Sequence, residues 1–243
     1  MKRNLITLAV AMFAFNVTAG SDPHWGYSGK TGPQNWYNLS EANASCEGQN
    51  QSPIDLSGFV ESTLSAIDFS YQAQGHEIIN NGHTVQVNFE TGSQIKLDQH
   101  QFNLVQYHFH SPSENHINGK SYPLEVHMVH ADADGALAVV AVMFDEGAEN
   151  EGLAKAWASL PKHAGDKHSL STPVSAFDLL PKSQDYYRFN GSLTTPPCSE
   201  GVRWLVMKQP LTASKAQISS FQSTLHEPNN RPIQPLNARV VMQ

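Results

Sequence analysis

Two segments carry the pattern that decides the fold: QYHFHSPSE at residues 106–114 and EVHMVH at residues 125–130. In both, polar or histidine side chains alternate with apolar ones, which is the period of a half-buried β-strand. The alternation predicts strands over Leu104–His110 and Glu125–His130. The apolar face of the first strand is expected to contribute three side chains to the core: Val105, Tyr107 and Phe109.

Three histidines on these strands form a candidate metal site. Side chains at positions i and i+2 of a strand share a face, so His108 and His110 can direct both imidazoles at one ion. A neighbouring strand would bring His127 to the same point. Three neutral imidazoles leave one tetrahedral position open, which indicates a catalytic rather than a structural zinc site.

Two hydrogen-bond acceptors accompany these histidines. Gln106 lies two residues before His108, and Glu125 lies two residues before His127, so each shares a face with its histidine. A metal-bound histidine usually donates its other ring N–H to such an acceptor. The offset therefore assigns Gln106 and Glu125 to orienting the metal ligands.

The other histidines weaken any argument from a single pair. The chain contains 12 histidines, and a His-x-His pair also occurs on ordinary surface strands. The third histidine and the two acceptors favour the metal site. His130 faces away by parity and is predicted to be structural, whereas His116, beside Asn118 and Gly119, has no assigned role.

The remaining pattern predicts a β-rich chain. Further strands are expected over Thr84–Glu90, Ala136–Phe144 and Gly201–Met207, and helices over Ala148–Leu160 and Ser214–Leu225, the second with Ser214 as N-cap. Residues 22–55 are rich in Gly, Pro, Asn and Trp and are expected to wrap irregularly around a core. The fold class is mostly β (α+β), a single domain with a few short peripheral helices.

The first residues differ in character from the rest of the chain. Lys2 and Arg3 precede an apolar run, Leu5–Val17, and small residues follow, which is the layout of a signal peptide over residues 1–19. Export to the periplasm or the medium is therefore expected. The net charge of −7 argues against a nucleic-acid partner, and no apolar stretch has the roughly 20 residues of a membrane span.

The chain has 2 cysteines, Cys46 and Cys198. Export makes a disulfide between them plausible, with two unrelated buried thiols as the alternative. Cys198 ends the segment GSLTTPPC, residues 191–198, which taken alone is typical of a rigid structural turn.

Together these segments resemble the α-class carbonic anhydrase family over nearly everything after the signal peptide. The matching segments are HWGYSGKTGPQNW (24–36), QNQSPIDL (49–56), NNGH (80–83), QYHFHSPSE (106–114), EVHMVH (125–130), GSLTTPPCSEGVRW (191–204) and RPIQPL (231–236). The resemblance implies a catalytic domain over residues 20–243, built around a large, mainly antiparallel central sheet. It also implies reversible hydration of carbon dioxide to bicarbonate and a proton.

The resemblance further implies a role for each matching residue. Zn²⁺ would be held by His108, His110 and His127, and would lower the pKa of bound water to about 7, as in carbonic anhydrases. The Thr194 hydroxyl would donate to the Glu114 carboxylate and accept from zinc-bound hydroxide, which is thereby aimed at carbon dioxide. The substrate site would comprise the apolar Val129, Val139, Leu193 and Trp204 together with Thr195.

The resemblance assigns proton transfer to His83. This residue would lie on the hydrophilic, water-filled side of the active site, which would be lined by Tyr27, Asn81, Gln86 and Thr195. Sulfonamides and anions are expected to inhibit. A homodimer is compatible with the sequence, which does not determine the oligomeric state. Ideal alternation puts His83 and Gln86 on opposite faces, so a bulge would be needed. Two positions depart from the pattern of animal members: Ser111 and Asn115.

Two rival functions remain open on the sequence. A cupin-type metal oxygenase would use the spacing of His108, His110 and Glu114, with Glu114 as a metal ligand. It would leave the Thr194 segment unexplained. A carbonic-anhydrase-like binding or adhesion domain would be expected to have lost one of the residues that bind the metal. None of the matching residues is missing here.

Overall fold

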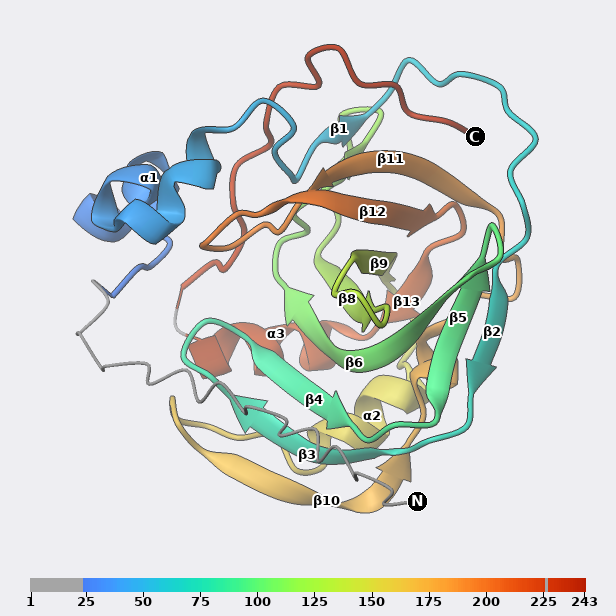
Figure 1. Ribbon diagram of the computed structural model, residues 1–243. Helices are drawn as coiled ribbons and strands as arrows, with labels where there is room; N and C mark the ends of the chain where they lie inside the picture. Colours follow the sequence, from blue (N-terminus) through green and yellow to red (C-terminus); the bar gives the residue numbers. More distant parts are fainter. Residues whose placement is uncertain (1–23, 226) are drawn as a thin grey trace, which may run out of the picture.

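One large, twisted sheet organises the chain (Figure 1). The computed structural model describes residues 24–225 and 227–243, so the predicted signal peptide lies outside the described residues. Within them, an 11-stranded sheet follows the order β10-β3-β4-β6-β8-β9-β12-β11, with β5 on β6, β2 on β5 and β13 on β9. A separate parallel pair is formed by β1 and β7.

The strands of the large sheet are β2 (Asp68–Tyr71), β3 (Gly75–Asn80), β4 (Val85–Phe89), β5 (Ser93–Leu97), β6 (His100–His110), β8 (Leu124–Ala131), β9 (Leu137–Glu146), β10 (Lys167–Val174), β11 (Tyr186–Ser192), β12 (Glu200–Met207) and β13 (Leu211–Ala213). The small pair comprises β1 (Asp55–Leu56) and β7 (His116–Ile117). The α-helices are α1 (Trp36–Leu39), α2 (Glu151–Trp157) and α3 (Lys215–Leu225). Short 3₁₀ turns span Gly29–Thr31, Pro33–Asn35, Glu41–Glu47 and Ala176–Leu179.

The predicted fold class is confirmed. Antiparallel pairing dominates the sheet, while β12 and β13 run parallel to β9. Each predicted strand appears within a few residues of its expected bounds, as β4, β6, β8, β9 and β12. Helix α2 is shorter than expected, and α3 begins as predicted, with Ser214 Oγ accepting from the Gln217 N–H at 3.2 Å.

One predicted core residue is wrong. Val105 is 47% exposed, although Tyr107 and Phe109 on the same strand are buried. The pairing of β6 with β8 shifts register between Leu104 and Gln106, which is a β-bulge. A bulge adds one residue to a strand and reverses the faces beyond it, so Leu104 takes the buried position and Val105 turns to solvent.

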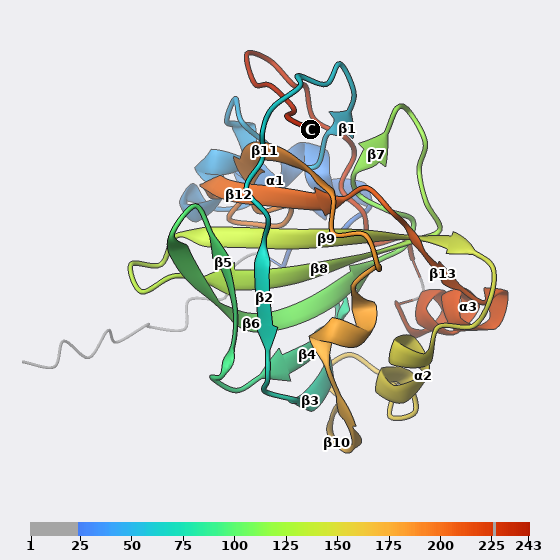
Figure 2. The ribbon, with the colours of Figure 1, turned by 90° about the vertical axis from the view of Figure 1, so that its right-hand side faces the viewer.

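The sheet separates two hydrophobic cores. The larger core includes residues of α2 and α3, such as Leu153 and Phe221, and the second includes Ile54, Val139 and Trp204. Figure 2 shows α2 and α3 side by side below strands β8 and β9, and α1, β1 and the C-terminus above them. No helix among the described residues is long and apolar enough to cross a membrane.

His130 is buried in the larger core, in agreement with its predicted structural role. Its Nδ1 lies 3.3 Å from the Ala138 carbonyl, and its Nε2 lies 2.8 Å from the Tyr71 hydroxyl. A carbonyl only accepts, so Nδ1 carries the hydrogen and Nε2 accepts from the tyrosine. Burial lowers the pKa of His130 to about 4.

This lowered pKa predicts a loss of stability in mild acid. As the pH falls, the unfolded chain binds a proton at His130 near pH 6.5, whereas the folded ring resists protonation until about pH 4. His130 should therefore lower the free energy of unfolding by about 2 kcal/mol between pH 7 and pH 5. Denaturant unfolding of the unmodified chain and of His130→Gln, in the same metal state, would measure this. Equal pH slopes for the two proteins would contradict it.

Candidate metal centre and active site

The structure brings the three predicted histidines together. In the register of β6 against β8, His108 lies opposite His127, and His110 lies opposite Glu125. The ring centroids are 4.6–5.3 Å apart. One nitrogen from each ring can be chosen so that the three lie within 4.8 Å of one another. Adjacent antiparallel strands therefore form a site able to bind a metal ion.

Two of the imidazoles have a side-chain acceptor beside their second nitrogen. His108 Nδ1 lies 2.9 Å from Gln106 Oε1, and His127 Nε2 lies 2.9 Å from Glu125 Oε1, although the latter pair is poorly aligned for a hydrogen bond. The two predicted acceptors thus lie beside their histidines. Their contacts leave His108 Nε2 and His127 Nδ1 available for a metal ion.

The third histidine has a partner that sequence reasoning missed. His110 Nδ1 donates to the backbone carbonyl of Asn229 at 2.7 Å. The other nitrogen, His110 Nε2, is buried and has no hydrogen-bond partner among the described residues. Because every residue carries a carbonyl, no side-chain pattern marks Asn229 as this acceptor.

Asn115, one of the two departures from the pattern of animal members, supports Glu125. The Glu125 carboxylate accepts from the backbone N–H of Glu114 at 2.7 Å, from that of Asn115 at 2.9 Å and from Asn115 Nδ2 at 2.8 Å. Asn115 Oδ1 in turn accepts from the Ile54 N–H at 3.2 Å. Asn115 therefore fixes the acceptor that lies beside His127.

Burial controls the protonation of the site. It lowers the pKa of His108, His110 and His127, and the neighbouring imidazoles add to the effect at His108 and His127. A metal binds only the neutral form of imidazole, so the site is preset for a cation. Burial also raises the pKa of the Glu114 and Glu125 carboxyls.

Glu114 lies directly beside the histidines. Its Oε1 accepts from the backbone N–H of Arg231 at 2.8 Å. Its Oε2 lies 3.5 Å from His110 Nε2 and 3.9 Å from His127 Nδ1, and has no hydrogen-bond partner among the described residues. The buried Thr194 side chain lowers the pKa of Glu114 and so offsets part of the increase that burial causes. The hydrogen bond expected from the Thr194 hydroxyl to Glu114 stays a prediction.

An apolar cluster borders the histidines. Val129, Val139 and Trp204 lie in one row across β8, β9 and β12, and Leu193 packs against the same cluster. The Trp204 ring meets His127 edge-on at 4.9 Å between centroids, and its Nε1 donates to the Ser192 carbonyl at 3.0 Å. The four predicted apolar pocket residues are therefore gathered beside one candidate ligand. Thr195 follows Thr194 in the adjoining loop and is half-buried.

His83 lies outside strand β4. It occupies a turn in which Asn81 Oδ1 accepts from the His83 and Thr84 N–H groups, both at 2.9 Å. Strand alternation does not apply there, so the expected bulge is unnecessary. The half-buried His83 ring stacks on Trp25 at 3.7 Å between centroids, and burial together with His24 lowers the pKa of His83.

Two further polar residues lie near this side of the site. Gln86 is the cross-strand neighbour of His108 in the pairing of β4 with β6. The Tyr27 hydroxyl is buried without a hydrogen-bond partner among the described residues. Burial and the negative charge of Glu114 raise the pKa of Tyr27, as expected for a phenol close to that carboxylate.

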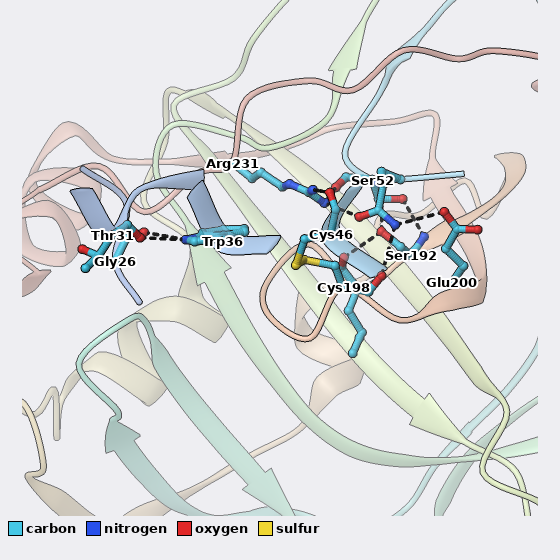
Figure 3. The surroundings of a disulfide bond; sticks show 11 residues. Gly26, Thr31, Trp36, Cys46, Ser52, Ser192, Cys198, Glu200 and Arg231 are labelled. Atoms are coloured by element: carbon cyan, nitrogen blue, oxygen red, sulfur yellow. Dashed lines mark hydrogen bonds between the residues drawn. A yellow bond between two sulfur atoms is a disulfide. The ribbon is translucent and has the colours of Figure 1, made fainter. Parts of the chain in front are cut away.

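The predicted disulfide is confirmed. Cys46 and Cys198 are bonded, with their Cα atoms 4.8 Å apart (Figure 3). Gln51 Nε2 donates to the Cys198 carbonyl at 3.1 Å, and Arg231 Nη2 donates to the Cys46 carbonyl at 2.9 Å. The loop that carries Thr194 is thus braced against the N-terminal segment and the segment of Arg231.

Three imidazoles that converge beside an apolar cluster, each with one nitrogen not hydrogen-bonded to any described residue, are typical of a metalloenzyme that acts on a small molecule. The sequence model of eukaryotic-type carbonic anhydrases matches residues 31–243. The chain belongs to this family, the α-class carbonic anhydrases.

Relatives match over nearly the whole chain. A carbonic anhydrase of Pectobacterium atrosepticum is 50% identical over 94% of this chain and 94% of its own length. One of Pectobacterium carotovorum is 49% identical over 100% of both chains. The α-carbonic anhydrase of Thermovibrio ammonificans, solved with the inhibitor sulfanilamide, has a TM-score of 0.90 and 45% identity, covering 91% of this chain and 99% of that one.

Proposed function

We propose that this protein catalyses the reversible hydration of carbon dioxide to bicarbonate and a proton, with Zn²⁺ held by His108, His110 and His127. The observation that carries the proposal is the convergence of three imidazoles, two buried and one half-buried, beside a cluster of apolar side chains, in a chain of the carbonic anhydrase family. Carbon dioxide is small and uncharged, so apolar side chains can hold it beside the metal.

The residues present fit a zinc ion. The buried His110 Nε2 has no partner within the described part of the chain, and a metal would satisfy it. The donor set of three imidazoles leaves a position for water or substrate. A zinc ion bound there would supply a water molecule that ionises near neutral pH and attacks carbon dioxide.

The protein's own groups prepare this chemistry. Burial disfavours the ionised form of Glu114, so the carboxylate depends on nearby positive charge and on donors such as the Arg231 N–H. A divalent cation on the imidazoles would provide that charge. An ionised Glu114 can only accept hydrogen bonds, so it would accept one from the Thr194 hydroxyl. The threonine oxygen would then be left to accept a hydrogen bond from the reacting water and orient it.

Val129, Val139, Leu193 and Trp204 would exclude water from one side of the site, which strengthens electrostatic interactions within it. The polar side would lead toward His83, half-buried against Trp25. Hydration releases a proton at every turnover, and an imidazole is the side chain best suited to pass it on near neutral pH.

Substitution of His83 tests the proton pathway. His83→Ala should lower kcat in weak buffer and leave kcat/KM nearly unchanged, because attack on carbon dioxide does not involve this ring. Added imidazole should restore much of the lost kcat. Stopped-flow hydration in weak and strong buffer measures both constants. An equal fall in kcat/KM, or no response to imidazole, would show that another group carries the proton.

A stopped-flow hydration assay tests the function itself. The zinc-loaded protein should accelerate hydration, a chelator should abolish the effect, and added zinc should restore it. Sulfanilamide should inhibit, as expected from the Thermovibrio ammonificans complex. Zinc binding without hydration would support the binding-domain alternative and overturn the proposal.

We also propose that residues 1–19 direct export and that residues 20–243 form the mature catalytic domain. The Cys46–Cys198 disulfide supports this, because disulfides persist in oxidising compartments such as the periplasm or the extracellular medium. N-terminal sequencing of the exported protein should find cleavage after Ala19.

A further inference from the structure

The buried side chain of Asn229 connects two parts of the proposed site. Its Oδ1 accepts from the Ser111 N–H at 2.9 Å, and its Nδ2 donates to the Phe109 carbonyl at 2.8 Å. The same Nδ2 donates to the His83 carbonyl at 3.0 Å. Its backbone carbonyl accepts from His110 Nδ1 at 2.7 Å. One residue thus binds the backbone on both sides of His110, the His110 ring and the turn that holds His83.

These contacts begin where the strand pairing ends. The register of β4 against β6 stops at Gln86 opposite His108. If it continued, Thr84 would pair with His110. Instead, Thr84 Oγ1 donates to the Phe109 carbonyl at 2.6 Å and accepts from the Phe109 N–H at 3.2 Å. Side chains replace the backbone ladder there, which lets the turn leave the sheet while remaining attached to β6.

We propose that Asn229 is a positioning residue that couples the proton-accepting turn of His83 to the metal ligand His110, an inference that rests on the proposed function. Asn229 is 2% exposed, so its amide is surrounded by protein rather than by solvent. Loss of the Nδ2 donor would release the His83 carbonyl, and loss of Oδ1 would leave the Ser111 N–H without this acceptor. Either change alters the distance from His83 to the imidazole cluster, on which proton transfer through water depends.

Two variants separate the contacts. Asn229→Asp is nearly isosteric and keeps the acceptor for Ser111 but lacks the donor to His83 and Phe109. Asn229→Ala removes the whole amide and keeps the backbone carbonyl that binds His110. Gln222→Ala is the matched control, because Gln222 donates to Ser111 Oγ at 2.9 Å at the same strand end and makes no hydrogen bond to His83 in the described structure.

The first readout needs no activity. In the zinc-free protein, amide hydrogen exchange at residues 81–84 should be faster in both Asn229 variants than in the unmodified chain and in Gln222→Ala. Zinc affinity, measured by chelator competition, should fall about 10-fold in Asn229→Ala. This is the lower end of the roughly 10–100-fold loss that follows removal of a residue that orients a metal ligand, because the backbone carbonyl that binds His110 remains. Unchanged exchange at residues 81–84 in both variants would overturn the coupling.

The second readout separates positioning from general damage. In weak buffer, kcat of the folded Asn229→Asp variant should fall toward that of His83→Ala, kcat/KM should fall less, and imidazole should restore part of kcat. A merely structural role would lower the amount of folded protein without creating a response to imidazole. Absence of that response would contradict the inference.

The coupling can also be measured on the unmodified chain, so failure of a variant to fold does not prevent the test. Since coupling is reciprocal, zinc binding near His110 should slow amide exchange at residues 81–84. Exchange there that is indifferent to zinc would refute the role of Asn229. Slowed exchange in a protein that does not hydrate carbon dioxide would instead show that the coupling exists and that the proposed function is wrong.

Discussion

His110→Ala should lose nearly all bound zinc and essentially all carbon dioxide hydration. His110 is 1% exposed, and its Nδ1 donates to the Asn229 carbonyl. Its Nε2 has no hydrogen-bond partner among the described residues, and its ring centroid lies 5.0 Å from that of His108 and 4.6 Å from that of His127. The variant would leave two ligands, and the loss in zinc affinity should exceed the roughly 10–100-fold that removal of an orienting partner causes. Elemental analysis and stopped-flow hydration on the same folded sample measure both effects.

His116→Ala is the control for this substitution. His116 is only half-buried, in the short strand β7, and is not part of the histidine cluster. It should keep zinc and activity at the level of the unmodified chain. Stoichiometric zinc together with normal hydration in His110→Ala would refute the ligand assignment.

Thr194→Ala should keep its zinc and lose about 100-fold in kcat/KM, the effect of removing one well-placed catalytic hydrogen bond. Thr194 is 5% exposed, and its side chain lowers the pKa of Glu114, which burial raises. The alanine variant cannot direct the reacting water or donate to the carboxylate, whereas the imidazoles are untouched. Hydration kinetics and zinc content of the purified variant give the two required numbers.

Thr194→Ser is the matched variant, because it keeps the hydroxyl and removes only a methyl group. It should recover most of the activity lost in Thr194→Ala. If Thr194→Ala lost its metal, or hydrated carbon dioxide normally, the orienting role would be wrong. If serine failed to restore activity, packing of the threonine methyl rather than the hydroxyl would be the important contact.

The local pattern of the sequence determined the strands and the histidine cluster. Alternation with period two follows from the geometry of a single strand, so it could be read at His108 and His110 without knowledge of the fold. The offset of Gln106 and Glu125 depends on the same geometry. The resemblance supplied the residues that no local pattern marks, Thr194 and His83 among them.

The tertiary structure alone decided the contacts between distant segments. The Asn229 carbonyl beside His110 and the Trp25 ring stacked on His83 join residues far apart in the chain. The Asn115 side-chain amide meets Glu125 only because the segment after β6 folds back beside β8. The exposure of Val105 also belongs here, because the bulge is a property of two paired strands. Alternation along the sequence determines which face of the sheet a side chain takes within one regular strand. Which residue of another segment it contacts depends on how the whole chain packs.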